Sequence, residues 1–174
     1  MDNDGYPDII TANIQEPNVI YFGNKEMNYN RRIIFNSSSD NSYSLDFGDL
    51  DGNGSIDIVV ANAGEPNEVF LNFDNGVSWK QIHLREEGLF TYDIILTDLN
   101  NDNRLDIVER NSDDINYCYR NRCDSGIFEQ DALKELTNYK EGKLNREGER
   151  IRAELSKYFK LPVVTEYILR LNQM

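Results

Sequence analysis

Short apolar runs alternate with polar turns along the chain up to about residue 125. The runs are two to five residues long, are rich in Ile, Val, Phe and Tyr, and are bounded by Asn, Asp, Gly and Pro. Runs of this length and composition between turn residues predict β-strands. The predicted strands cover residues 9–10, 19–22, 33–35, 43–47, 58–60, 69–71, 82–84 and 92–96.

This pattern recurs with a period of 49 residues. The segments 2–10, 51–59 and 100–108 align without gaps, and the residues that follow them keep the same spacing. Each complete unit contains four predicted strands, and a repeat of roughly 40–50 residues with four strands is typical of a β-propeller blade. The sequence therefore predicts a mainly β fold, a partial β-propeller of four-stranded antiparallel blades with two full blades and part of a third. Coinciding residues include Asn13, Asn62 and Asn111, and also Asn18, Asn67 and Asn116.

The 49-residue register ends at about residue 128, where the spacing of the apolar residues becomes helical. A first candidate helix covers 131–139, Asn145 is placed to cap a second that ends at Leu161, and Pro162 suits the first turn of a third. The sequence thus predicts a repeat array over 1–127 and an α-helical C-terminal segment over 128–174. We expect this segment to pack on the array or on a partner.

The acidic residues gather in the repeats. The formal net charge is −13, from 31 acidic and 18 basic residues, and residues 1–128 hold 23 of the acids but 9 of the bases. Such a surface repels phosphate backbones, so nucleic acid is not expected as a partner. Dispersed acids would serve solubility alone, but these acids concentrate in the loop that opens each repeat, which points to a bound cation.

In the second repeat, residues able to offer oxygen ligands occupy every other position, at Asp49, Asp51, Asn53, Ser55 and Asp57. A purely oxygen ligand set suits a hard cation such as Ca²⁺, which takes roughly 6–8 oxygens. Ser55 would contribute its backbone carbonyl, and Asp57 would close the site. Without a cation, these carboxylates would repel one another at close range. The alternative interpretation is a solvated acidic turn that holds no ion.

The first and third repeats carry related loops. The turn around the ion is expected at Gly54, and Gly5 and Asn103 hold that place in the other loops, because Gly and Asn adopt positive φ most readily. The first loop lacks its leading ligand, since the chain starts one residue too late. The predicted ligands are Asp98, Asn100, Asp102, the carbonyl of Arg104 and Asp106 in the third repeat, and Asp2, Asp4, the carbonyl of Tyr6 and Asp8 in the first.

An EF-hand is the competing calcium motif. It requires a glutamate at loop position 12 and a helix on each side. Glu109 holds that position in the third repeat, but Val60 and Thr11 hold it in the second and first. All three loops are followed by strand-like residues, so the EF-hand interpretation is disfavoured.

The segment Asp49–Asn62, with the sequence DLDGNGSIDIVVAN, resembles the FG-GAP/VCBS repeat family. The resemblance extends over residues 1 to about 125. It implies an integrin-α-type β-propeller, usually of seven blades, with calcium ions in the loops between strands. It also implies an extracellular or cell-envelope setting and roles in adhesion or ligand binding.

Three features depart from that family. The blades are too few to close a ring, the chain begins inside a loop, and it opens without an export signal. From these features we expect a fragment of a longer protein or a truncated product, in which open strand edges favour aggregation. The alternative is that several copies assemble into a ring.

No pattern in the sequence predicts an enzyme. His83 is the only histidine, and no Ser or Cys pairs with it in a recognisable nucleophile motif. The acidic pairs at 86–87 and 113–114 are interpreted as solvated charges. Cys118 and Cys123 are compatible either with a disulfide in an oxidising compartment or with a buried thiol at Cys118.

The sequence therefore favours a calcium-binding, non-catalytic binding or adhesion module whose protein or carbohydrate ligand is unidentified. An accessory non-catalytic part of a polysaccharide-active or other envelope enzyme is the alternative, and a remnant without independent function is a third. No apolar run reaches membrane-spanning length, so no membrane span is expected.

Overall fold

The computed structural model describes residues 1–36, 40–112, 116–121 and 128–132, and within these it contains eleven strands and no helix. The mainly β prediction is therefore confirmed. The strands are β1 Ile9–Thr11, β2 Val19–Phe22, β3 Arg31–Ile34, β4 Ser42–Gly48, β5 Asp57–Asn62, β6 Glu68–Asn72, β7 Trp79–His83, β8 Thr91–Thr97, β9 Asp106–Asn111, β10 Tyr117–Asn121 and β11 Phe128–Ala132.

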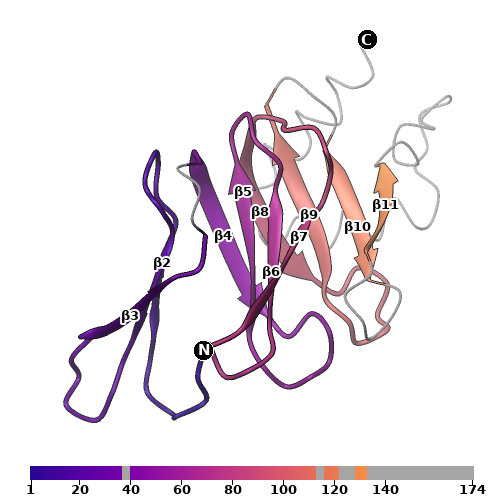
Figure 1. The fold of residues 1–174 in the computed structure, drawn as a ribbon. Helices are drawn as coiled ribbons and strands as arrows, with labels where there is room; N and C mark the ends of the chain where they lie inside the picture. The colour runs from indigo at the N-terminus through magenta and orange to yellow at the C-terminus, as the bar shows by residue number, and fades with distance from the viewer. Residues whose placement is uncertain (37–39, 113–115, 122–127, 133–174) are drawn as a thin grey trace, which may run out of the picture.

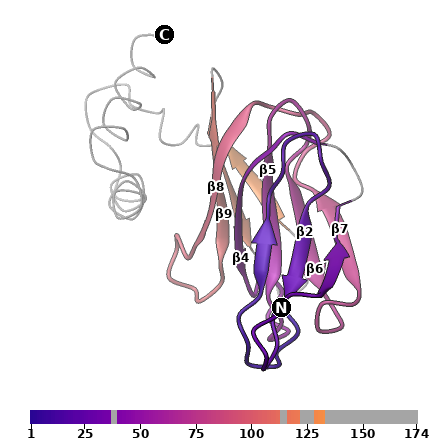
Figure 2. The ribbon, with the colours of Figure 1, turned by 90° about the vertical axis from the view of Figure 1, so that its left-hand side faces the viewer.

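The strands form three antiparallel sheets that follow one another along the chain. Their orders are β1-β2-β3, β4-β5-β6-β7 and β11-β10-β9-β8, so each sheet is built from strands consecutive in sequence. Figure 1 shows the sheets side by side, from β3 at one edge to β11 at the other, and Figure 2 shows them stacked along this direction. Each four-stranded sheet spans one 49-residue period, but its boundaries differ from those of the predicted unit. The strand before each acidic loop, β4 or β8, belongs to the sheet that follows it, so the loop lies between the first two strands of that sheet.

The repeat extends to irregular features of the sheets. A shift of register between Ser42 and Ser44 in β4 recurs between Thr91 and Asp93 in β8. Isolated bridges join Ile14 to Asn41 and, one period later, Ala63 to Phe90. The backbone therefore repeats along with the sequence, including its bulges.

The two larger apolar cores lie at the boundaries between sheets, whereas a smaller cluster of Leu99, Val108 and Cys118 belongs to the third sheet and its acidic loop. The two faces of the middle sheet pack on different neighbouring sheets. One core joins Ile20 and Phe22 of the first sheet to Ile58, Val60 and Phe70 of the second. The other joins the second sheet to the third, and its buried members are Leu50, Val59, Ala61, Val69, Leu71, Ile94, Leu96, Ile107 and Tyr119. The alternation of side chains along β5 and β6 thus sends successive residues into different cores.

A buried polar chain crosses the first boundary. Asn18 donates through Nδ2 to Ser42 Oγ at 2.9 Å, and Ser42 Oγ donates to Asn62 Oδ1 at 2.9 Å. One period later, Asn67 Nδ2 and Thr91 Oγ1 are 2.8 Å apart. These contacts explain why asparagine recurs at the turn positions noted in the sequence.

Two sequence-based expectations differ from the structure. The predicted helix over 131–139 does not begin at Asp131, because Asp131 and Ala132 belong to β11, whose backbone pairs with β10 from Tyr117 to Asn121. The third strands also begin earlier than predicted, since Arg31 and Trp79 pair with the ends of β2 and β6. The rest of the predicted C-terminal helical segment lies outside the described residues.

Candidate metal centre

The loop between β4 and β5 is anchored by Asp57, the first residue of β5. Its Oδ2 accepts from the Leu50 N–H at 2.7 Å, and its Oδ1 accepts from the Asn72 N–H at 2.8 Å. Asp57 is fully buried. One carboxylate therefore fixes both the start of the loop and the end of β6.

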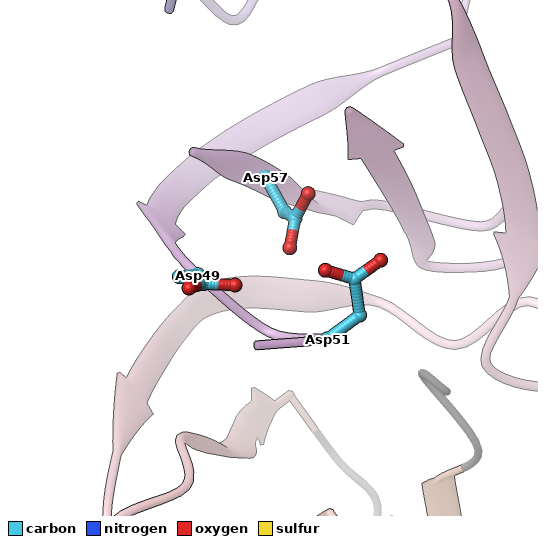
Figure 3. Close-up of side chains that lie close together, drawn as sticks. All are labelled: Asp49, Asp51 and Asp57. Carbon is cyan, nitrogen blue, oxygen red and sulfur yellow. The ribbon is translucent and has the colours of Figure 1, made fainter. Parts of the chain in front are cut away.

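Three carboxylates of this loop converge. Asp49, Asp51 and Asp57 each place an oxygen such that these oxygens lie within 4.8 Å of one another. Figure 3 shows the three side chains directed toward a common space. Asp51 is 8 % exposed, so only Asp49 is substantially open to water. Three negative groups at this separation repel one another, and a bound cation would offset that repulsion.

None of these three carboxylates forms an ion pair with a basic side chain in the described part of the protein, whereas Asp2 and Asp102 do. Their repulsion is instead partly offset by backbone donors. Asp49 Oδ1 accepts from the Gly52 N–H at 2.8 Å, and its Oδ2 accepts from the Gly54 N–H at 2.9 Å. The backbone N–H groups of the loop therefore surround the Asp49 carboxylate, and no basic side chain of the described residues does so.

The pKa of Asp57 is raised to about 6, chiefly by burial and also by the neighbouring charges of Asp51 and Asp49, against the two backbone hydrogen bonds that lower it. A buried carboxylate beside two like charges favours its protonated form, and a bound cation would reverse that preference. The pKa of Asp106, at the same place in the third repeat, is also raised by burial.

The remaining predicted ligands of the second loop lie at its exposed side. Asn53 Oδ1 accepts from the Ser55 N–H at 2.7 Å, and Asn53 Nδ2 donates to the Asn72 carbonyl at 3.0 Å. The Asn53 amide thus belongs to the same loop as the three carboxylates, and its oxygen is one further neutral donor available to a cation.

The third loop repeats the backbone but not the charge arrangement. Asp106 accepts from the Leu99 and Asn121 N–H groups, both at 2.9 Å, as Asp57 does in the second loop. The Arg104 guanidinium lies 2.6 Å from Asp102 Oδ2, so this carboxylate already has a positive partner. In the described part of the chain, Asp98, Asp102 and Asp106 do not form a convergent group like that of the second loop.

The other contacts of the third loop are internal. Asp98 accepts from the Asp102 and Asn103 N–H groups at 3.1 and 2.8 Å. Asn100 Oδ1 accepts from the Asp102 N–H at 2.9 Å, and Asn100 Nδ2 donates to Asp102 Oδ2 at 2.9 Å. The predicted side-chain ligands are therefore neighbours, but they are bound to one another and to Arg104.

The first loop is closed by basic groups. Asp8 accepts from the amino group of Met1 and from the Gly23 N–H, and Asp2 pairs with Arg31 at 2.6 Å. Asp4 accepts from the Tyr6 N–H at 2.9 Å and is exposed. Asp8 thus keeps the two-sided anchoring of Asp57, while Asp2 has a guanidinium as its counter-charge.

The turn predictions are confirmed at Gly5, Gly54 and Asn103, whose φ values are +86°, +82° and +66°. A second left-handed position, two residues earlier in each loop, was not predicted from the sequence. Its residues are Asn3, Gly52 and Asn101, with φ of 58°, 75° and 58°.

The contacts of Asn72 and Asn121 were not predicted either. The only available signal for these two residues was their 49-residue spacing.

The residues of the competing interpretations lie elsewhere. Glu109 is buried within β9 and pairs with Arg85 at 3.0 Å, and strands flank its loop, so the EF-hand alternative is excluded. His83 is half exposed and lies 3.3 Å from Glu68. Cys118 is buried, whereas Cys123 lies outside the described residues. The described part of the chain contains no helix with the length and hydropathy that a membrane span requires.

Comparison with known families agrees with the repeat seen in sequence and backbone. A family model described as FG-GAP-like repeat matches residues 1–60 and again residues 49–109. No match was found among the curated proteins. The two matches overlap at the second acidic loop, and together they span more than half of the chain. The chain therefore belongs to the family of FG-GAP-like repeat proteins, whose repeats are β-propeller-like.

Proposed function

We propose that this protein is a calcium-stabilised, non-catalytic binding module and that its principal calcium site is the loop holding Asp49, Asp51 and Asp57. FG-GAP-like repeats generally act as binding modules without catalysis. The observation that carries the calcium assignment is the convergence of these three carboxylates, with their oxygens within 4.8 Å and no basic partner in the described residues.

The donor set fits a hard divalent cation. In this proposal Asp49, Asp51 and Asp57 offer carboxylate oxygens, Asn53 offers an amide oxygen, and Ser55 offers its carbonyl. No nitrogen or sulfur ligand stands among them, which suits Ca²⁺ better than zinc or copper. When bound, the ion would neutralise the repulsion among the carboxylates, and it would stabilise the folded state because the unfolded chain holds no assembled site.

The loops of the first and third repeats are weaker candidates, because a guanidinium neutralises one of their carboxylates. Arg31 pairs with Asp2 and Arg104 pairs with Asp102, both at 2.6 Å. A calcium ion would have to displace these contacts and would experience the nearby positive charge. Their predicted ligands therefore form secondary sites, occupied at higher calcium concentration than the second loop.

The remaining expectations belong to the same proposal. A calcium-dependent array of this family suits an extracellular or cell-envelope setting, where calcium is abundant. The repeats would bind a protein or carbohydrate ligand as part of a longer protein or a multi-copy ring. We assign residues 1–127 to this array and add β11, which pairs with β10 of the third sheet. Residues 133–174 lie outside the described part of the protein.

Thermal unfolding in excess calcium and in chelator tests the proposal, with Asp51→Asn as the reporting variant. Asp51 is preferable to Asp57, because Asp57 also fixes Leu50 and Asn72 and its replacement would lower stability regardless of calcium. Calcium at about 100 times its Kd adds about 2.7 kcal/mol, which raises Tm by on the order of 10 °C for a domain of this size. Asp51→Asn should remove most of this increase.

The matched control is Asp74→Asn, which removes one exposed acid of the same repeat outside the loop. It should keep the full calcium response. A calcium response that is absent from the wild-type protein, or that Asp51→Asn and Asp74→Asn retain equally, would show that the acids are surface charge.

A further inference from the structure

Two buried asparagines connect each acidic loop to its neighbour. Asn72 ends β6, Asn121 ends β10, and they are 0 % and 1 % exposed. They lie one 49-residue period apart. Both side-chain amides donate through Nδ2 to backbone carbonyls, and these carbonyls define their role.

Asn121 contacts both its own repeat and the preceding one. Its N–H donates to Asp106 Oδ1 at 2.9 Å, and its Nδ2 donates to the Leu105 carbonyl at 3.3 Å, both in the third repeat. The same Nδ2 donates to the Leu50 carbonyl of the second repeat at 2.6 Å. One side chain thus joins two consecutive acidic loops.

Asn72 makes the same three contacts one period earlier. Its N–H donates to Asp57 at 2.8 Å, and its Nδ2 donates to the Ile56 carbonyl at 3.2 Å and to the Met1 carbonyl at 3.0 Å. The recurrence of the full set at two boundaries shows a feature of the repeat rather than an isolated contact.

Leu50 is the residue through which this contact reaches the metal centre. It stands between Asp49 and Asp51, two of the three converging carboxylates, and it is 2 % exposed. Its N–H is held by Asp57 of its own repeat at 2.7 Å, and its carbonyl is held by Asn121 of the next repeat at 2.6 Å. The two peptide groups flanking the Leu50 Cα are therefore held by residues of two different repeats, and their orientation sets the directions of Asp49 and Asp51.

We propose that Asn121 is a positioning residue that completes the cation site of the preceding repeat, so that the site holding Asp49, Asp51 and Asp57 spans two repeats. This inference rests on the proposed calcium function of that loop. Asn121 does not touch the cation. It orients the backbone that carries two ligands, and such outer partners typically change metal affinity by about 10–100-fold when they are removed.

The same contact makes calcium binding and repeat packing interdependent. An ion that orders the second loop also fixes the Leu50 carbonyl against Asn121, and this stabilises the boundary with the third repeat. By linkage, the factor by which calcium binding favours the closed boundary equals the factor by which the closed boundary favours calcium binding. A change that loosens this boundary at Asn121 therefore lowers calcium affinity.

Calcium titration of the full chain by calorimetry tests the proposal through four proteins: the wild type, Asn121→Ala, Asp51→Asn and the double variant. The four proteins form a double-mutant cycle. The calcium binding that Asp51→Asn removes belongs to the second loop, so the cycle separates it from calcium binding in the third loop. Asn121→Ala should weaken the second-loop Kd by about 10-fold or more. Asp51→Asn should then change the binding of Asn121→Ala much less than it changes that of the wild type.

The control is Asn67→Ala, a buried asparagine that bridges the same boundary through Thr91 at the opposite end of the strands. It should destabilise the fold yet leave the second-loop Kd within about twofold. Wild-type affinity in Asn121→Ala, or an equal loss in Asn67→Ala, overturns the positioning role. A wild-type protein that binds no calcium overturns the proposed function itself, which is a distinct result.

If Asn121→Ala does not fold, Asn121→Asp at pH 8 takes its place, because it keeps the shape of the side chain and removes the Nδ2 donor. Its extra negative charge alone would tighten calcium binding. A weaker second-loop Kd in this variant therefore reports the lost hydrogen bond to Leu50, whereas an unchanged or tighter Kd overturns the proposal.

Discussion

At the residue scale, Asp57 serves two purposes that oppose each other in the absence of a cation. Its two backbone hydrogen bonds fix the loop and favour the ionised carboxylate, while burial and the charges of Asp49 and Asp51 favour the protonated one. Burial is the largest effect, so the pKa lies at about 6 instead of its ordinary 3.8. The calcium-free loop is therefore strained electrostatically at neutral pH.

This strain predicts the pH dependence of stability. Between about pH 4 and 6, folded Asp57 holds more protons than unfolded Asp57, so its contribution to the free energy of unfolding falls as pH rises. In chelator, the Tm of the wild type should fall relative to that of Asp57→Asn as pH rises through this window, and the difference between the two should stay constant above it. In excess calcium, which favours the ionised form, the shift should reverse. A difference that is independent of pH in chelator would contradict the raised pKa.

The sequence allowed a prediction wherever the residue type itself indicates a special backbone conformation. Gly54 and Asn103 were recognised because a turn around a loop needs positive φ, and both have it. Asn72 and Asn121 were not recognised, because an asparagine at a strand end resembles any polar turn residue. Their function depends on carbonyls 71 residues away in the chain, at Met1 and Leu50. No local pattern encodes a contact of that separation.

At the scale of the strands, the apolar runs predicted the eight strands β1 to β8 at least in outline, and β9 and β10 follow from the 49-residue alignment of the third repeat. Neither signal indicated β11. The sequence of β11, FEQDA, has no alternation of apolar residues. Its backbone is a strand because it pairs with β10 over five residue pairs. A strand at the outer edge of a sheet is specified by the ladder beside it, and composition alone assigned this segment to a helix.

The buried hydroxyl of Ser42 gives a test at this scale. It accepts from Asn18 and donates to Asn62, both across 2.9 Å, and Ser42 is 3 % exposed. Ser42→Ala would leave two buried amide groups without this partner, which should cost about 1–3 kcal/mol in a urea unfolding titration. Ser42→Thr should retain most of the stability, since Thr91 holds the equivalent position one period later. Ser78→Ala, at an exposed site, should change stability by less than about 0.5 kcal/mol.

At the scale of the whole molecule, the repeats depend on one another. The two larger apolar cores join consecutive sheets, and the asparagine contacts join consecutive loops across the same boundaries. An array of this kind is stabilised chiefly by nearest-neighbour interfaces, because one unit alone cannot bury its apolar faces. The sequence predicted the repeat and its family, but the residues at each boundary became visible only once the sheets were placed side by side.

Neighbouring residues of β6 separate the two boundaries. Leu71 packs in the core between the second and third sheets, whereas Phe70, on the other face, packs between the first and second. Each is at most 1 % exposed, so replacing either by alanine should cost about 2–5 kcal/mol. In native-state hydrogen exchange, Leu71→Ala should lower protection in β5–β6 and β8–β9 together and spare β2. Phe70→Ala should lower it in β2 and β5–β6. Identical exchange patterns for the two variants would show that the array opens as one unit, with no separable boundaries.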